Sequence, residues 1–109
     1  MPDTFRCELL PDRDRVVVRP VGEVDLATAP AFEQRVSEAA GAGFASIVID
    51  LRDVTFLDSS GLRVLLAAHV AGQDGSPALE VVRARPEVHR VVELTGLDGV
   101  FRWVEPRDP

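Results

Sequence analysis

The chain has 109 residues, 46% of them hydrophobic, so it is long and apolar enough for one compact domain and too short for two ordinary cores. Its 12 basic and 18 acidic residues give a formal net charge of −6, which argues against direct binding to nucleic acid or to an anionic membrane surface. Cys7 has no second cysteine to pair with, and no stretch approaches the roughly 18 uncharged apolar residues of a membrane span, so we expect a cytoplasmic protein.

The first elements along the chain are two predicted strands. Phe5–Leu10 alternates apolar and polar residues, and Val16–Val21 is rich in β-branched residues. Pro11 to Asp14 lies between them and has the composition of a turn. The two strands are therefore predicted to pair as a hairpin.

An amphipathic helix and a buried strand are predicted next. In Pro30–Ala40 the apolar residues recur at helical spacing, and Gly41 follows the last of them. Either Thr28 or Asp25 is suited to cap the start of this helix. Ser46–Leu51 is a run of Ile and Val, which is typical of a central strand buried on both faces.

The second half of the chain continues the alternation of helices and strands. A buried strand segment, Thr55 to Leu57, leads into a helix that begins at Ser59 or Ser60 and ends near Ala71. The remaining predicted elements are a strand at Ala78–Val82, a helix at Pro86–Leu94 and an edge or tail strand at Val100–Val104. This order predicts an α/β layer structure with right-handed crossovers.

Short oxygen-bearing side chains gather where the second helix begins. Asp58, Ser59 and Ser60 occupy the position at which the first backbone amides of a helix lack acceptors, so simple capping explains them. Gly61 costs about 1 kcal/mol relative to alanine inside a helix. It indicates a close approach to the backbone there, either by another part of the chain or by a partner.

The second helix is apolar around most of its circumference. One face, which we expect to pack on the sheet, comprises Leu62, Leu65, Leu66 and His69. The other apolar positions are Val64, Ala67, Ala68 and Ala71. Such a helix is either buried against a neighbouring helix as well as the sheet, or it presents its second face to a partner.

Two motifs and the order of the elements resemble a known family. The sequence DSSGL at Asp58 to Leu62 follows a strand, and GEVD at Gly22 to Asp25 precedes the first helix. Together with the elements from Val16 to Trp103, these motifs resemble the anti-sigma factor antagonists, a bacterial family built on the STAS domain. The resemblance implies one STAS-like α/β domain over residues 1–109, with a mixed sheet of about four to five strands and helices packed against it.

The resemblance also implies a regulatory function without catalysis or a cofactor. Family members bind an anti-sigma factor that is also a serine/threonine kinase and thereby free the sigma factor. The kinase phosphorylates the first serine of the motif, here Ser59, which ends binding, and a serine phosphatase restores the free hydroxyl. ATP and Mg²⁺ belong to the kinase. The residues expected to contact the partner are Asp25, Asp58, Ser60, Gly61, Val64 and Ala68.

The sequence also allows other functions to be compared with this one. A hydrolase with Ser59 as nucleophile is disfavoured, because the position of the first glycine in G-x-S-x-G holds Leu57 and His69 is too far along the helix. A STAS adaptor subunit of a transport ATPase or a stress-signalling complex, without a phosphoswitch, stays open. His69 and His89 with one distant cysteine do not predict a metal site. We expect a monomer, or a weak dimer through an exposed edge strand near Phe101 and Trp103.

Overall fold

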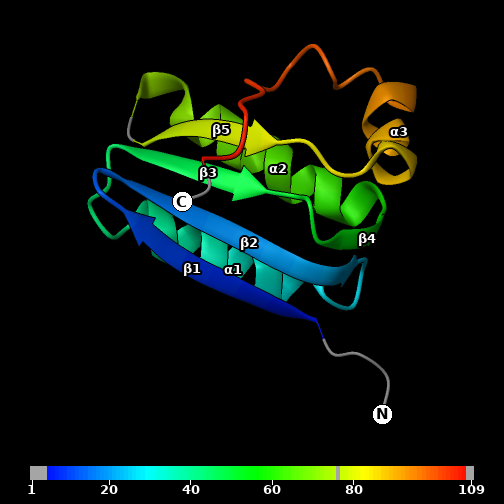
Figure 1. Ribbon diagram of the computed structural model, residues 1–109, viewed down its shortest axis with the longest axis horizontal. Helices are drawn as coiled ribbons and strands as arrows, with labels where there is room; N and C mark the ends of the chain where they lie inside the picture. The colour runs from blue at the N-terminus through cyan, green and yellow to red at the C-terminus, as the bar shows by residue number, and fades with distance from the viewer. Residues whose placement is uncertain (1–4, 76, 108–109) are drawn as a thin grey trace.

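Five strands and three α-helices alternate along the chain in the computed structural model, which describes residues 5–75 and 77–107 (Figure 1). The strands are β1 (Arg6–Asp12), β2 (Arg15–Val24), β3 (Ser46–Asp50), β4 (Val54–Leu57) and β5 (Ala78–Val82). The helices are α1 (Ala29–Ala40), α2 (Ser59–Ala71) and α3 (Pro86–Leu94), with a short 3₁₀ helix at Gly72–Asp74. Among the described residues, no helix combines the length and apolar character needed to cross a membrane.

The sheet is mixed and is organised around β2. Its hydrogen-bonded order is β1-β2-β3-β5, with β1 antiparallel to β2 and the other pairs parallel. β2 is ten residues long, and its amino-terminal half pairs with β3 while its carboxyl-terminal half pairs with β4. The predicted hairpin and the predicted central, buried strand at β3 are therefore confirmed.

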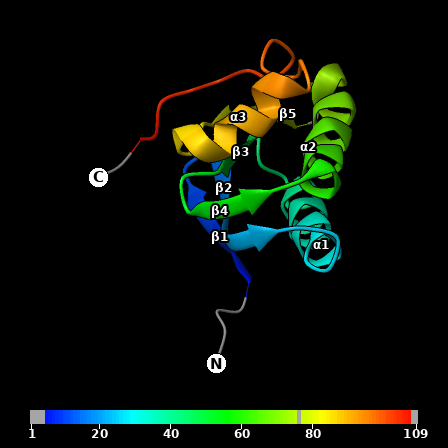
Figure 2. The ribbon, with the colours of Figure 1, turned by 90° about the vertical axis from the view of Figure 1, so that its right-hand side faces the viewer.

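The two faces of the sheet differ. α1 and α2 lie together on one side, and the C-terminal segment lies on the other (Figure 2). Because side chains alternate along a strand, Val16 and Val18 of β2 enter the core while Val17 and Arg19 line a cleft on the opposite face. The core residues that are entirely inaccessible to solvent include Phe32, Ile49, Leu51 and Leu65.

The segment before α2 forms a strand of its own, which the predicted order does not count. A tight turn with a hydrogen bond from Val54 N to Leu51 O (3.1 Å) separates β4 from β3 and moves it along β2. The prediction that Thr55 to Leu57 is buried is wrong for two residues, because Thr55 and Phe56 are exposed. β4 pairs with β2 alone, and only its first and last residues, Val54 and Leu57, are buried.

The predicted strand at Val100–Val104 is also wrong. This segment makes a single bridge, from Trp103 to Val81 at the edge of β5. Phe101 is only 5% exposed and its ring meets that of Trp103 edge to face at 5.9 Å between centroids. Among the described residues this segment makes no strand beyond that bridge, so the edge strand expected near Phe101 and Trp103 is not formed.

The packing of α2 generates the first testable prediction. Leu65 is fully buried against the sheet, whereas Leu66, assigned by its helical position to the same face, is 36% exposed. Leu65→Ala should therefore lower the free energy of unfolding by about 2–5 kcal/mol, through lost burial and a cavity. Leu66→Ala removes the same atoms and should cost about 1 kcal/mol or less. Urea unfolding of the two variants compares them, and equal losses would contradict this orientation of α2.

Candidate functional site

The carboxyl ends of β2 and β4 lie side by side and bring two loops together. Val24 pairs with Leu57, and the Asp58 amide donates to the Val24 carbonyl at 3.3 Å. The residues that follow this pair, Asp25 on one strand and Asp58 on the other, therefore start at the same edge of the sheet. In Figure 2 the β2–α1 connection and the β4–α2 turn lie next to each other.

Asp58 caps α2, as the capping interpretation predicts. Its backbone is extended, its carboxylate Oδ1 accepts from the Ser60 amide at 2.9 Å, and its carbonyl accepts from Leu62 N at 3.1 Å. Ser59 is the first residue of the helix, and its side chain is exposed. Within the described part of the chain its hydroxyl has no hydrogen-bond partner. Capping thus accounts for Asp58 and leaves the Ser59 hydroxyl without a structural role.

Asp25 shapes the turn before α1. Its Oδ1 accepts from the amides of Ala27 (3.0 Å) and Thr28 (3.1 Å), an arrangement that carboxylate side chains commonly make in turns. Thr28 occupies the N-cap position, but its hydroxyl donates to the Glu23 carbonyl at 2.8 Å and does not cap the helix amides. The two candidate caps therefore hold the loop together, and Asp25 is half-buried in it.

Gly61 is explained by packing within the chain. The residue is buried, and an added Cβ would lie 2.5 Å from Leu57 Cδ1 and 2.7 Å from Val24 Cγ1. Real Cβ atoms do not approach other atoms so closely, so only glycine lets the first turn of α2 rest on the ends of β2 and β4. Close contact with its own chain is sufficient to account for this glycine.

The second apolar face of α2 packs toward α1. Val64 is 7% exposed and Ala68 is half-buried, and both line a shallow groove of about 160 Å³ between the two helices, with Val36 on the opposite wall. Of the residues expected to contact a partner, Gly61 and Val64 are thus buried. The others are at least partly accessible: Asp25, Asp58, Ser60 and Ala68.

One accessible apolar residue in this region was not singled out in the sequence. Leu26, between Asp25 and the start of α1, is 79% exposed. The sequence signal that could have identified Leu26 is its position as a large apolar residue in a polar loop between a strand and a helix. We call the accessible residues Asp25, Leu26, Asp58, Ser59 and Ser60 the Ser59 surface.

The described residues give no indication of metal or thiol chemistry. No group of three or more His, Cys, Asp or Glu side chains among them is placed to hold a metal ion. Burial raises the pKa of the Cys7 thiol to about 11, so this cysteine is protonated at neutral pH and is a poor nucleophile.

A mixed five-stranded sheet with two helices on one face, and a serine turn that leads into one of them, is the architecture of a STAS domain. The family model described as STAS domain matches residues 9–107, so the chain belongs to the STAS domain family.

Its relatives include anti-sigma factor antagonists. The anti-sigma-F factor antagonist RsfB of Mycobacterium tuberculosis is 35% identical over 102 residues, which cover 93% of this chain and 82% of the relative. The crystal structure of an anti-sigma factor antagonist from Mycobacterium paratuberculosis has a TM-score of 0.84 at 35% identity and covers 98% of this chain and 90% of that one. The Bacillus cell fate determinant SpoIIAA in its phosphorylated form shares the fold, with a TM-score of 0.69, 22% identity and coverage of 96% and 93% of the two chains.

The packing around Gly61 predicts the effect of a single methyl group. Gly61→Ala should lower the free energy of unfolding by about 1–2 kcal/mol, because overpacking outweighs the better helix propensity of alanine. Gly99→Ala is the matched control, since nothing lies within 4 Å of an added Cβ there. Thermal and urea unfolding measure both variants, and a Gly61→Ala protein as stable as wild type would show that the close contact is not real.

Proposed function

We propose that this protein is an anti-sigma factor antagonist whose binding to its partner is switched off by phosphorylation of Ser59. The partner is an anti-sigma factor with serine/threonine kinase activity, and a serine phosphatase resets the switch. The observation that carries the proposal is the exposed Ser59 hydroxyl, which has no hydrogen-bond partner in the described part of the chain. The 35% identity to a named antagonist over nearly the whole chain supports the same function.

The position of Ser59 suits it to phosphoryl transfer. In the proposed reaction Ser59 Oγ forms a bond to the γ-phosphorus of the kinase's ATP, the bond to the β–γ bridging oxygen breaks, and ADP leaves. The hydroxyl proton passes to a base of the kinase. Because no contact within the fold has to be broken to reach this hydroxyl, the kinase needs no local unfolding of α2.

The fold is expected to tolerate the phosphate. A phosphate adds about −1.5 to −2 charges, and the unpaired amides and dipole of a helix N-terminus stabilise negative charge there. Asp58 already uses the Ser60 amide, so the phosphate does not replace the existing cap. Phosphorylation should then alter the surface of the protein and leave its stability almost unchanged.

The same charge is expected to prevent binding. Asp25 and Asp58 already make the Ser59 surface acidic, and the exposed Leu26 offers an apolar contact beside them. A partner that closes over this surface removes water from Ser59, and a phosphate there would be both bulky and uncompensated. A hundredfold loss of affinity needs only about 2.8 kcal/mol, which an unpaired charge at a desolvated contact readily supplies.

The choice of serine can be tested with a pair of neighbouring variants. Incubation with the cognate kinase and Mg²⁺-ATP should add one phosphate to wild type and to Ser60→Ala, and none to Ser59→Ala, as measured by intact mass. Ser60 is the matched control because it is adjacent in the same turn and its side chain is half-buried. Phosphate on Ser59→Ala but not on Ser60→Ala would move the switch to Ser60. Wild type that gains no phosphate would favour a STAS adaptor without a phosphoswitch.

The effect of charge on binding can be separated from the effect of size. Ser59→Asp and Ser59→Asn introduce side chains of nearly the same shape, and only the first carries a charge. Ser59→Asp should bind the anti-sigma factor about a hundredfold more weakly than wild type, and Ser59→Asn should lose much less. Calorimetric titration measures the affinities, and circular dichroism should show similar melting for both variants. Equal affinity of Ser59→Asp and wild type would refute an electrostatic switch.

A further inference from the structure

An open cleft of about 650 Å³ lies on the face of the sheet opposite α1 and α2. Its floor includes the half-buried Val17 of β2 above the buried Val48 of β3 and Val82 of β5, and its accessible apolar lining residues are Leu10 and Pro11. The turn between β1 and β2 forms one wall, and the C-terminal segment 105–107, which passes in front of the sheet in Figure 1, forms another. The described residues that line this cleft are all different from those of the Ser59 surface, so it is a separate feature of the molecule.

The cleft is basic in an acidic protein. Its charged lining residues are Arg13, Arg15, Arg19, Arg52 and Arg107, with Asp12, Asp50 and Glu105. Five arginines against these three carboxylates and Asp53, which pairs with Arg19, leave a net charge of +1, whereas the whole chain carries −6. Positive charge is therefore concentrated on this face, where it raises the local concentration of anions.

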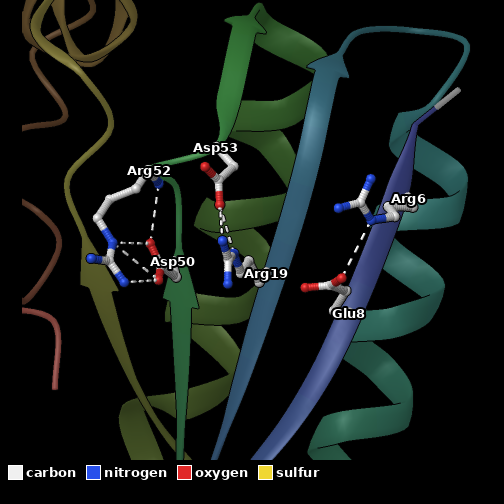
Figure 3. Close-up of polar contacts among 6 residues, drawn as sticks. All are labelled: Arg6, Glu8, Arg19, Asp50, Arg52 and Asp53. Atoms are coloured by element: carbon white, nitrogen blue, oxygen red, sulfur yellow. Dashed lines mark hydrogen bonds and ion pairs between the residues drawn. The ribbon is translucent and has the colours of Figure 1, made fainter. Parts of the chain in front are cut away.

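Two of the arginines are held in place by carboxylates of the fold. Arg19 Nε donates to Asp53 Oδ2 at 2.6 Å, and Arg52 Nη2 donates to Asp50 Oδ2 at 2.8 Å (Figure 3). The Asp50 side chain is only 6% exposed, so its charge requires this partner. Each of these two pairs is therefore largely neutral.

Arg15 has hydrogen-bond donors that no described residue uses and that a ligand could accept from. Its side chain is 7% exposed, and its Nε donates to Asp12 Oδ2 at 3.0 Å. Within residues 5–75 and 77–107, neither Nη1 nor Nη2 of Arg15 has a hydrogen-bond partner. A buried guanidinium with two unused nitrogens presents a fork of donors that matches the oxygens of a phosphate or carboxylate.

The walls of the cleft supply two further cations. Arg13 and Arg107 have no ionic partner among the described residues; Arg13 belongs to the β1–β2 turn, and Arg107 to the C-terminal segment, which also carries Glu105. Arg13 adopts a φ of 63°, which asparagine or glycine would adopt at lower cost, so the turn itself gives no reason for an arginine at this position.

We propose that the cleft binds a small organic phosphate monoester. Arg15 holds the phosphate from below, Arg13 and Arg107 approach it from the walls, and an apolar or aromatic body lies against Leu10, Pro11 and Val17. A phosphate presents three oxygens to the donors of Arg13, Arg15 and Arg107, whereas a carboxylate presents only two. The volume of about 650 Å³ lies within the range of about 300–1,000 Å³ that is usual for small-molecule sites.

Phenyl phosphate is a suitable probe of the whole chain, since it combines the dianion with an aromatic body. An NMR titration that follows the backbone amides should give saturable shifts at the β1–β2 turn, β3 and the C-terminal segment. Phenyl phosphate should bind more tightly than inorganic phosphate, which lacks the apolar body, and more tightly than phenylacetate, which lacks the second charge.

Matched variants test whether the binding is specific to the cleft. Arg13→Gln with Arg107→Gln should weaken phenyl phosphate binding about tenfold, because each exposed ion pair contributes up to about a factor of five. Arg85→Gln with Arg90→Gln removes the same charge from exposed positions on α3 and its N-cap, and affinity should then be unchanged. All four positions are exposed, so the variants should fold.

Three outcomes would overturn the proposal. The first is an equal loss of affinity in both double variants, which would indicate attraction to net charge alone. The second is an absence of saturable binding at millimolar probe concentrations. The third is phenylacetate binding as tightly as phenyl phosphate, which would replace the phosphate monoester with a carboxylate ligand. None of these measurements involves the kinase, so they do not bear on the function proposed for Ser59.

Discussion

The parallel pairing of the carboxyl-terminal half of β2 with β4 is the constraint on which the candidate site depends. Val24 and Leu57 are partners in this pairing, and the side chains of both lie within 3 Å of the position that a Cβ on Gly61 would take. The register of this pairing therefore fixes where along β2 and β4 the first turn of α2 begins. It thereby also fixes the direction in which Ser59 faces. A shift of one residue would reverse which side chains of β4 enter the core.

The order of helices and strands was largely predictable, because each helix carries apolar residues at helical spacing between residues that stop it. The separate strand β4 was not predictable, since it has four residues and is distinguished from β3 only by a turn. The C-terminal aromatic residues looked like a strand because Phe and Trp favour sheets. Their rings instead pack on the domain, a tertiary contact that no local pattern reveals.

The Ser59 surface could be predicted in part from the sequence and the basic cleft could not, because local patterns do not reveal tertiary contacts. Asp58 and Ser59 are adjacent in sequence, so the turn that they form could be anticipated from local chemistry alone. The arginines of the cleft are scattered from Arg13 to Arg107, and only the strand order and the path of the C-terminal segment bring them together. Charge that is dispersed in the sequence of an acidic chain thus becomes a local basic surface.

Under the proposed function, neighbouring residues at the start of α2 divide stability and signalling between them. Asp58 supplies the cap, Gly61 supplies the close contact with the sheet, and Ser59 supplies neither. A switch placed on Asp58 or Gly61 would change the free energy of folding together with the affinity for a partner, and the two effects would be coupled. Because the Ser59 hydroxyl lies outside both contacts, a modification there can act on affinity at little cost in stability. That separation requires the cap and the glycine to be in place, so the proposed switch at Ser59 depends on neighbours that take no part in it.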